Sequence, residues 1–218
     1  MRVYHFVNEK FGLENILRRR LKIARINELN DPFEFLATEA SNATVRRAFL
    51  AVKVQQAIST GILCFSEAWT NPVQWSHYAN HHQGICMGFD VPDNQLKAVS
   101  YVRERLLLDW PKMQSDPAFG EEFMSQVIST KFEHWSYEQE MRSFVRLDPA
   151  TEENGLFFMD FSPDIRLSEI IVGHCSPITR NQLKDALGNL ASEVRCLKAR
   201  LAFKTFEVTE QKLGSIWR

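Results

Sequence analysis

Two glutamates separated by one residue, Glu138 and Glu140, are the side chains best suited to act together on one ligand. They belong to the stretch KFEHWSYEQEMRSFVR, residues 131–146, whose second half alternates with period two. On a strand, two residues at this spacing share a face about 7 Å apart, so one carboxylate can anchor a ligand while the other stabilises a transition state. Arg142 on the same face would hold Glu140 in place and keep it ionised. The alternative is an exposed strand face with a ladder of glutamate and arginine, which contributes little to stability.

Aromatic and imidazole side chains gather between two apolar runs of strand length, residues 61–66 and 84–90. A connection between strands needs turn residues rather than tryptophans and histidines, and binding groups commonly sit on loops held by rigid elements. The segment therefore predicts a pocket rim, or else it forms the wall of an aromatic-rich core. These side chains are Trp69, Asn71, Trp75, His77, Tyr78, His81 and His82.

Other polar residues could face the same pocket. His5 stands between two aromatic residues on an expected first strand, residues 3–7. A histidine in that setting is usually a core residue, and it becomes a ligand-binding candidate when other polar groups converge on it. The stretch NDPFE, residues 30–34, has the composition of a turn. Within it, Asp31 or Glu34 is a candidate to face the pocket.

Metal chemistry has weaker support in the sequence. Three histidines and a cysteine lie close together, but no HExxH motif is present and no nearby carboxylate completes a ligand set, so we expect no metal there. These residues are His77, His81, His82 and Cys86. A metal-dependent nuclease or phosphohydrolase that uses Asp31, Glu34, His77 and Glu138 stays open as an alternative. The sequence contains no Walker loop, no GxGxxG and no GxSxG.

The bulk composition narrows the class of protein. The net charge of -1 gives no global field that would draw the chain to nucleic acid or to an anionic membrane. No apolar run reaches the roughly 18 residues that a membrane-spanning helix needs. Four scattered cysteines without a CxxC pair indicate reduced thiols in a cytoplasmic protein. A chain of 218 residues suits one domain, residues 1–218, with helical segments at about 41–58 and 117–134 decorating a β core.

Hydrophobic periodicity predicts an α+β fold with a mixed, largely antiparallel sheet, because strands and helices are interleaved without regular alternation. Strands or strand-like runs are expected at residues 3–7, 21–26, 61–66, 84–90, 96–101, 135–147, 156–161, 168–173, 194–198 and 203–208. Helices are expected at residues 11–20, 41–58 with Ser41 as the cap, a short one with Pro72 in its first turn, 103–110, 119–132 and 179–190.

Several of these motifs, taken in order, resemble a large bacterial family known only as a domain of unknown function. The likeness covers most of residues 3–173 and is specific as a set, although the family name implies no activity. Its parts are Tyr4-His5-Phe6, NDPFE at 30–34, Cys64-Phe65-Ser66, WSHYA at 75–79, Gly84-Ile85-Cys86, Gly88-Phe89-Asp90, Lys131, and Trp135-x-Tyr137-Glu138-x-Glu140-x-Arg142.

The order of motifs is also similar to that of ADP-ribosyltransferases of the His–Tyr–Glu or Glu-x-Glu kinds, which implies a split-sheet core and NAD as the cofactor. By this resemblance His5 holds the NAD ribose, and Trp75 or Tyr78 walls the nicotinamide. Glu140 binds the ribose 2′-hydroxyl and stabilises the oxocarbenium-like charge as nicotinamide leaves, while Glu138 orients the acceptor. Further residues expected at the NAD site are Tyr4, His77, Ser66, Arg142, Asn30 and Asp31.

The resemblance implies transfer of ADP-ribose to a protein or nucleic-acid acceptor, in a toxin or phage-defence setting. The sequence departs from the superfamily on the middle strand, where Cys64-Phe65-Ser66 stands in place of Ser-Thr-Ser. The alternative from a different class is a non-catalytic module that binds a nucleotide or a partner segment in the same cleft.

Overall fold

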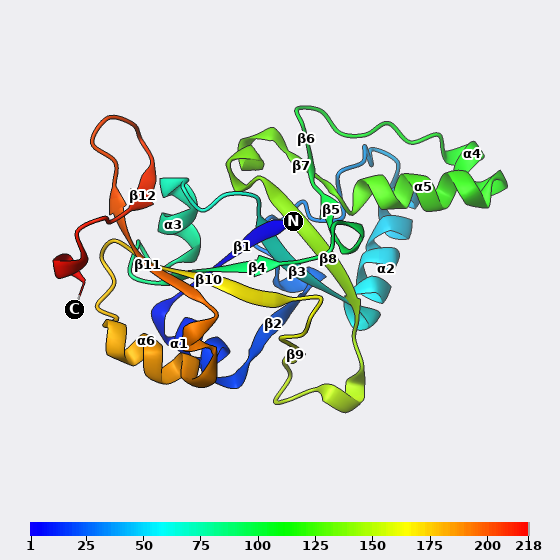
Figure 1. Ribbon diagram of the computed structural model, residues 1–218. Coiled ribbons are helices and arrows are strands. Elements are labelled where there is room, and N and C mark those ends of the chain that lie inside the picture. The colour runs from blue at the N-terminus through cyan, green and yellow to red at the C-terminus, as the bar shows by residue number, and fades with distance from the viewer. Residues whose placement is uncertain (218) are drawn as a thin grey trace.

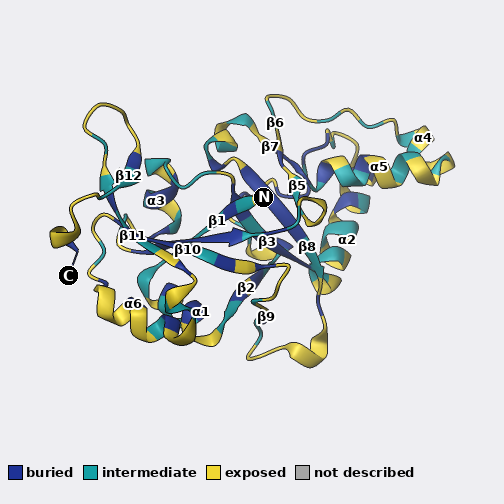
Figure 2. Cartoon of the chain, in the orientation of Figure 1, coloured by how far each residue is buried: buried dark blue, intermediate teal, exposed yellow. Residues whose placement is uncertain are grey.

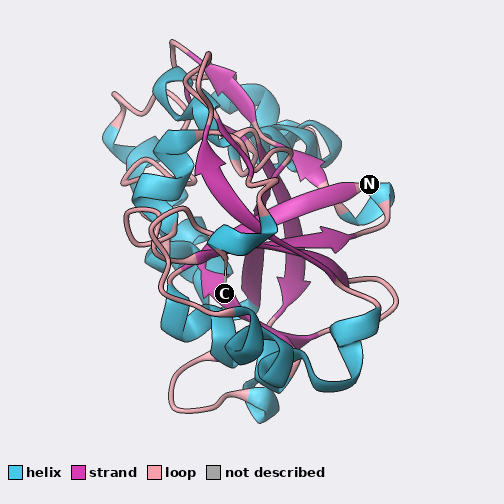
Figure 3. Cartoon of the chain, turned by 60° about the vertical axis from the view of Figure 1, so that its left-hand side comes forward, coloured by secondary structure: helices cyan, strands magenta, loops and turns pink. Residues whose placement is uncertain are grey.

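A ten-stranded sheet runs through the protein, and helices pack around it (Figure 1, Figure 3). The structure is a computed structural model that describes residues 1–217. The strands of this sheet are β1 (Arg2–Val7), β2 (Arg20–Arg25), β3 (Thr60–Ser66), β4 (Ile85–Asp90), β5 (Lys97–Ala98), β8 (Glu140–Arg146), β9 (Phe157–Asp160), β10 (Arg166–Val172), β11 (Arg195–Leu201) and β12 (Val208–Glu210). Two further short strands, β6 (Ser100–Val102) and β7 (Thr130–Phe132), pair with each other.

The strand order is β12-β11-β10-β4-β1-β3-β2-β9, and β8 pairs with both β3 and β5. Within this large sheet the parallel pair is β10 with β11, and the other neighbours are antiparallel. The fold is therefore α+β with a mixed, largely antiparallel sheet, which confirms the predicted fold class.

The helices form two groups at opposite ends of the sheet (Figure 1). They are α1 (Glu9–Arg18), α2 (Ala43–Ser59), α3 (Pro72–Tyr78), α4 (Trp110–Ser115), α5 (Pro117–Val127) and α6 (Arg180–Leu187). Helices α1 and α6 pack against each other near one end. Helices α2 and α5 share an apolar cluster at the other end, built on Val45, Phe49, Phe123 and Val127.

Local sequence signals explain where the helices begin. Asn71 Oδ1 accepts the backbone N–H of Val73 at 2.8 Å, and Pro72 occupies the first turn of α3, as predicted. The cap of α2 lies one residue later than predicted. It is Asn42, whose Oδ1 accepts the N–H of Thr44 at 2.7 Å, because the hydroxyl of the expected cap Ser41 donates to Glu39 instead.

The main apolar core lies between the sheet and its helices, and burial is most continuous along β3, β4, β8 and β10 (Figure 2). Alternate residues of the strands supply it, as the period-two pattern predicts. A second cluster lies beneath α3. Its centre is Trp75, which is 0% exposed, packs edge-on against Phe6 at 5.3 Å and donates its indole N–H to the carbonyl of Trp69.

The sheet opens beside β3. One edge of β3 pairs with β8 along its whole length. The other edge is shared, because Ile62 pairs with Ala24 of β2 and Ser66 pairs with Tyr4 of β1. Cys64 lies between these two positions. Its backbone N–H and C=O point toward the same edge as those of Ile62 and Ser66, since alternate residues of an antiparallel strand bond to the same neighbour. In the described chain no residue of β1 or β2 is in register with Cys64, so β1 and β2 diverge there.

Several predicted helical or strand segments are wrong in type or extent. Residues 103–110 were expected to be helical, but the backbone of Leu106 bonds to Ala37 and Glu39, and this tertiary pairing holds the segment extended. The helix expected at 119–132 ends at Val127, because residues 130–132 form β7 beside β6. The strand expected at 203–208 is an exposed loop up to β12, with Phe206 99% exposed.

None of the helices described for residues 1–217 combines the length and the apolar character that crossing a membrane would need. All four cysteines are free thiols.

Replacing Trp75 with alanine should lower the free energy of unfolding by about 3–5 kcal/mol, because a fully buried indole is removed from a closed cluster. Urea denaturation followed by circular dichroism measures this. Phe206→Ala is the matched aromatic control and should change stability by less than about 0.5 kcal/mol. A Trp75→Ala protein as stable as the control would contradict the placement of Trp75 in the core.

Candidate functional site

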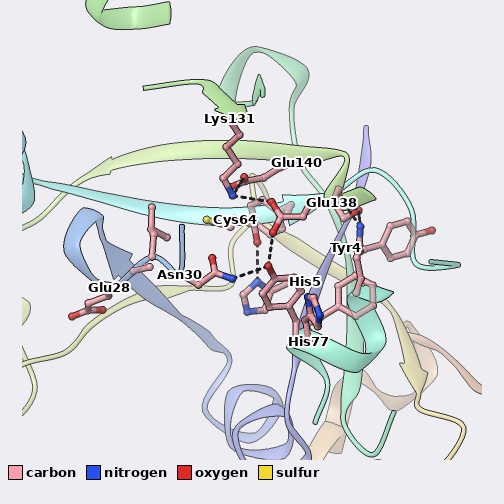
Figure 4. A pocket seen from close by; sticks show the side chains of 16 residues that line it. Tyr4, His5, Glu28, Asn30, Cys64, His77, Lys131, Glu138 and Glu140 are labelled. Atoms are coloured by element: carbon pink, nitrogen blue, oxygen red, sulfur yellow. Dashed lines mark hydrogen bonds and ion pairs between the residues drawn. The ribbon is translucent and has the colours of Figure 1, made fainter. Parts of the chain in front are cut away.

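A cavity of about 450 Å³ opens where β1 and β2 diverge from β3. Residues of β1, β3 and α3 line it, and the side chains of Lys131, Glu138 and Glu140 border it from a later segment (Figure 4). We call it the split-sheet cavity. The cavity exists because neither β1 nor β2 pairs with β3 at Cys64. Side chains therefore border a space that backbone hydrogen bonds between strands would otherwise close.

Most of the residues predicted for the site meet at this cavity. They come from elements far apart in the chain, which the strand order brings together. They are Tyr4, His5, Asn30, Ser66, His77, Tyr78, Glu138 and Glu140.

Three predicted binding residues lie elsewhere. Trp75 faces the core under α3 and does not wall the cavity, because its side of the short helix packs against β1 and β4. Asp31 is buried in its own turn, where its Oδ1 accepts the N–H of Phe33 at 2.9 Å. Arg142 lies behind Glu140 with its guanidinium 0% exposed, so it supports the site without bordering the cavity.

The prediction that Glu138 and Glu140 lie on one strand is also wrong in detail. Glu138 ends a 3₁₀ helix, Glu133–Glu138, and Gln139 takes a left-handed backbone with φ of 45° before β8 begins. The carbonyls of Tyr137 and Glu138, which a strand would pair, are instead bonded by the side chain of Gln74. The two carboxylates still converge, because Lys131 bonds both of them.

Arg142 organises the charged centre of the site. Its Nη1 and Nη2 donate to the two carboxylate oxygens of Glu34 at 2.9 and 2.6 Å. Its Nε and Nη2 donate to Glu140 at 2.8 and 3.1 Å. Such forked pairs fix both partners in plane, so the NDPFE turn and the start of β8 are held in one position.

Lys131 connects this pair to the cavity. Its Nζ lies 2.7 Å from Glu140, 2.8 Å from Glu138 and 3.3 Å from Glu34. With all three carboxylates ionised, they face two cations, Lys131 and Arg142, so the cluster carries one net negative charge. The charge lies at the cavity through Glu138 and Glu140 (Figure 4).

The two glutamates differ in acidity. Burial favours the neutral acid at Glu140, but the adjacent Arg142 and Lys131 outweigh it and lower the pKa of Glu140 to about 2. At Glu138 burial prevails over Lys131, and its pKa is raised above the ordinary value of 4.5. Glu140 is therefore a fixed anion, whereas Glu138 is the glutamate whose charge responds to its surroundings.

Tyr78 and Asn30 complete the wall next to Glu138. The Tyr78 hydroxyl donates to Glu138 and accepts the side-chain N–H of Asn30 at 2.8 Å. Burial and the nearby carboxylate of Glu138 raise the pKa of Tyr78, so the phenol keeps its proton. Glu138 is thus bonded by Tyr78 on one oxygen and by Lys131 on the other.

His5 fills the break in the sheet. Its Nδ1 lies 3.0 Å from the carbonyl oxygen of Cys64, the position that neither β1 nor β2 pairs. Burial lowers the pKa of His5 against the opposing effect of this hydrogen bond, which favours the neutral ring. A neutral ring beside a carbonyl must carry its proton on Nδ1, so Nε2 is left as an acceptor for a ligand.

Gln74 is a site residue that the sequence did not single out. Its Nε2 lies 2.6–3.0 Å from three acceptors, the carbonyls of Tyr137 and Glu138 and the hydroxyl of Ser66, which fixes the orientation of the amide. Its Oε1 is buried and has no partner. An orphaned acceptor on a residue that borders the cavity is suited to a ligand N–H or O–H.

Two more members of the site could have been found from the sequence only in part. Lys131 stands in the same stretch as the glutamates, but nothing in the pattern shows that a lysine seven residues before Glu138 turns inward. The prediction that Asp31 or Glu34 of the NDPFE turn faces the pocket is wrong, because Glu34 does not border the cavity either and instead pairs with Arg142 behind it. Within residues 1–217 no group of three or more His, Cys, Asp or Glu side chains is arranged to hold a metal ion.

Residues 74–143 match the model of a family described as "Protein of unknown function (DUF2971)". This confirms the predicted resemblance to a family known as a domain of unknown function. The matched segment runs from α3 into β8 and contains Gln74, Tyr78, Lys131, Glu138 and Glu140. No curated protein and no solved structure matches the chain.

The stability that Glu140 contributes should depend on pH in a defined direction. Its pKa is depressed in the folded state, so its contribution is fully present above the ordinary value of 4.5 and is lost as the pH falls toward about 2. Glu140→Gln should cost about 3 kcal/mol at pH 7, because it removes one carboxylate partner from each of two buried cations, Arg142 and Lys131. Urea unfolding at pH 7, 4 and 3 should show this difference shrinking as the pH falls below 4.5.

The control for that series is Glu152→Gln, at an exposed glutamate, which should match the wild type at each pH. A difference between Glu140→Gln and wild type that stays constant down to pH 4 and below would contradict the ion-pair assignment.

Proposed function

We propose that the protein is an NAD-dependent ADP-ribosyltransferase-like enzyme that uses the split-sheet cavity. The observation that supports this most strongly is convergence. His5 on β1, Tyr78 on α3, and Glu138 and Glu140 on a later segment all border one cavity. The resemblance assigns these positions to the NAD ribose, the nicotinamide and the transfer step.

The charge of the cavity suits this chemistry. The ligand end that loses nicotinamide is a pyridinium in the ground state and an oxocarbenium-like cation in the transition state. A cluster with one net negative charge, which includes the fixed anion Glu140, favours both states. Because Arg142 and Lys131 already hold that anion in place, little reorganisation is needed as positive charge develops.

The hydrogen-bond pattern distributes the roles between the two glutamates. Glu140 already accepts from Nε and Nη2 of Arg142 and from Lys131, so we assign it the electrostatic role. Glu138 accepts one bond on each oxygen, from Tyr78 and from Lys131, and retains capacity for more. We therefore assign to Glu138 the hydrogen bond to the nicotinamide ribose, with His5 Nε2 as a second acceptor for a ribose hydroxyl.

The reaction balances with the groups present. The bond between C1′ of the ribose and the nicotinamide nitrogen breaks, nicotinamide leaves with the electron pair, and the acceptor bonds to C1′. The acceptor releases one proton, and without an acceptor water attacks in its place, so that NAD is hydrolysed. Glu138, with its raised pKa, is the group at the cavity best suited to receive the proton.

Two alternatives have less support. A metal-dependent nuclease would need Asp31 and Glu34 as ligands, but Asp31 is buried in its turn and Glu34 is engaged at both oxygens by Arg142. A non-catalytic nucleotide-binding module would need no fixed anion beside a group of raised pKa. In line with its scattered free thiols, we place the enzyme in the cytoplasm.

Glu138→Gln should reduce NAD turnover by about 10²–10³-fold, the usual loss when one transition-state interaction is removed. The assay follows nicotinamide release from labelled NAD with and without cell extract. The wild-type rate should fall on the acid side at a pH above the ordinary 4.5 of a glutamate, because the pKa of Glu138 is raised and its anion is required.

Tyr78→Phe removes one of the two bonds to Glu138 and should cost less, about tenfold. Glu152→Gln should behave as wild type. Equal turnover by wild type and Glu138→Gln, or no turnover by either with any acceptor, would refute the proposal. Stabilisation by NAD without turnover would support the binding-module alternative.

The buried Oε1 of Gln74 should make the site sensitive to the nicotinamide amide. The analogue with 3-acetylpyridine keeps the carbonyl but has no N–H, and its KM should rise about 5- to 100-fold over NAD, since a buried acceptor stays unpaired. Gln74→Leu should abolish this discrimination. If Gln74→Leu does not fold, the wild-type comparison alone decides, and equal KM values would rule out the role of Gln74.

A further inference from the structure

A second cavity, of about 440 Å³, lies on the other side of Lys131 from the split-sheet cavity. We call it the aromatic cavity. Lys131 borders both spaces, so a molecule in one lies next to the catalytic cluster of the other. Its walls come from the NDPFE turn, the extended segment before α4, and β7 with the 3₁₀ helix that follows. The residues that characterise it are Phe33, Ala37, Arg103, Arg105, Phe132 and Trp135.

Large aromatic rings at this cavity are left open to solvent. Phe33 is 51% exposed and Phe132 is 42% exposed, although both line the cavity. Trp135 is partly buried, with Lys131 Nζ 5.5 Å from the centre of its ring. The walls thus offer ring faces and edges rather than a closed aliphatic pocket, which suits a flat, aromatic occupant.

Cations accompany these rings. The guanidinium of Arg105 lies 4.9 Å from the ring centre of Phe33, and Arg105 and Arg103 are both exposed at the rim. Arg103 also pairs with Glu133 at 2.6 Å. A guanidinium beside an aromatic ring can stack on a base and bind a phosphate at the same time. An aliphatic or acidic partner segment would not use this combination of stacking and phosphate binding.

Aromatic contacts lead from Trp135 of the aromatic cavity through Tyr137 to His77 of the split-sheet cavity, and Phe132 forms a separate pair with His134. Phe132 lies 4.4 Å from His134, and Trp135 lies 6.1 Å from Tyr137, all as distances between ring centres. Tyr137 lies 5.7 Å from His77, which borders the split-sheet cavity. Successive rings beside cations are the usual platform for an unpaired nucleic-acid strand.

We propose that the aromatic cavity binds an unpaired base of the acceptor, and that the acceptor is therefore a single-stranded nucleic acid. The role of this site in holding the acceptor rests on the proposed function, whereas the binding of a single strand does not depend on it. The base stacks among Phe33, Phe132 and Trp135, and Arg105 contacts the adjacent phosphate. A neighbouring nucleotide then reaches Glu138 past Lys131. The near-zero net charge of the chain makes this binding local rather than a consequence of a global field.

The test measures binding without NAD, so that it does not depend on catalysis. Fluorescein-labelled oligonucleotides of about 10 nucleotides, single-stranded DNA, single-stranded RNA and a duplex, are titrated and followed by anisotropy. We expect a single strand to bind more tightly than the duplex, and the DNA and RNA arms to show which sugar is preferred. Trp135→Ala should weaken binding about 5- to 150-fold, the usual loss of one stacked base.

Arg105→Gln should weaken binding across sequences and lower the salt slope by about 1, the loss of one phosphate contact. The matched controls are Phe206→Ala and Arg47→Gln, an exposed aromatic and an exposed arginine elsewhere, which should bind within about twofold of wild type. If Trp135→Ala does not fold, Phe132→Leu takes its place, because its ring is already largely exposed.

Absence of single-strand binding, or equal losses in Trp135→Ala and Phe206→Ala, would overturn the proposal. Transfer of labelled ADP-ribose to protein alone, in extract with its nucleic acid intact, would overturn it in favour of a protein acceptor. NAD turnover by the Glu138 assay without oligonucleotide binding would refute the acceptor site and leave the proposed function standing. Oligonucleotide binding without NAD turnover would support the single-strand site and refute the proposed function.

Discussion

The arginine at position 142 is the constraint on which the site depends. Its guanidinium is 0% exposed, and a buried cation is tolerated only when its charge and its hydrogen bonds are fully matched. Glu34 and Glu140 provide that match in two forked pairs, and the carbonyl of Ile128 accepts a further bond from Nη1. Because none of these partners can move without leaving a buried charge unpaired, three distant segments are fixed against one another.

The opening of the sheet is the second constraint. A continuous sheet would cover the charged cluster with backbone, and no ligand could reach Glu138. Strand β3 avoids this by sharing one edge between β1 and β2, which leaves the carbonyl of Cys64 to the side chain of His5. The histidine therefore has a structural task that also sets its tautomer. The same hydrogen bond that satisfies the backbone leaves Nε2 as an acceptor on a ring that borders the cavity.

The sequence predicted the parts of this architecture that depend on local physics. Short β-type and apolar runs predicted β1, β3, β4, β10 and β11, and Pro72 predicted α3. It failed where tertiary contacts decide. Leu106 is extended because its backbone pairs with residues 37–39, although the sequence around it predicts a helix. Likewise, Glu138 leaves the strand because Gln74, a residue 64 positions earlier, bonds its carbonyl.

The site residues, like the strands and helices, could be predicted where a local pattern marks them and not where tertiary contacts decide. Polar residues in conspicuous patterns, such as His5, Tyr78 and the two glutamates, were found because aromatic neighbours and close spacing set them apart. Trp75 was misplaced because a short helix has two faces, and the pattern of seven residues does not decide which one turns toward the core. Gln74 carries no charge and no motif, so only the three acceptors around its Nε2 reveal it.

The Glu-x-Glu spacing does not show that the two glutamates have different surroundings, which only the three-dimensional arrangement reveals. In sequence the two carboxylates are equivalent, yet one faces two cations and the other faces one cation and a phenol. The first is driven toward permanent ionisation, and the pKa of the second is raised. A transfer reaction needs both properties, a fixed negative charge for the developing cation and a second carboxylate that can receive a proton. Lys131 lies between the two and binds both, so loss of either carboxylate changes the electrostatics of the other. For this reason the cluster acts as one electrostatic unit, in which Arg142 and Glu34 are as necessary to the proposed transfer as the glutamates that border the cavity.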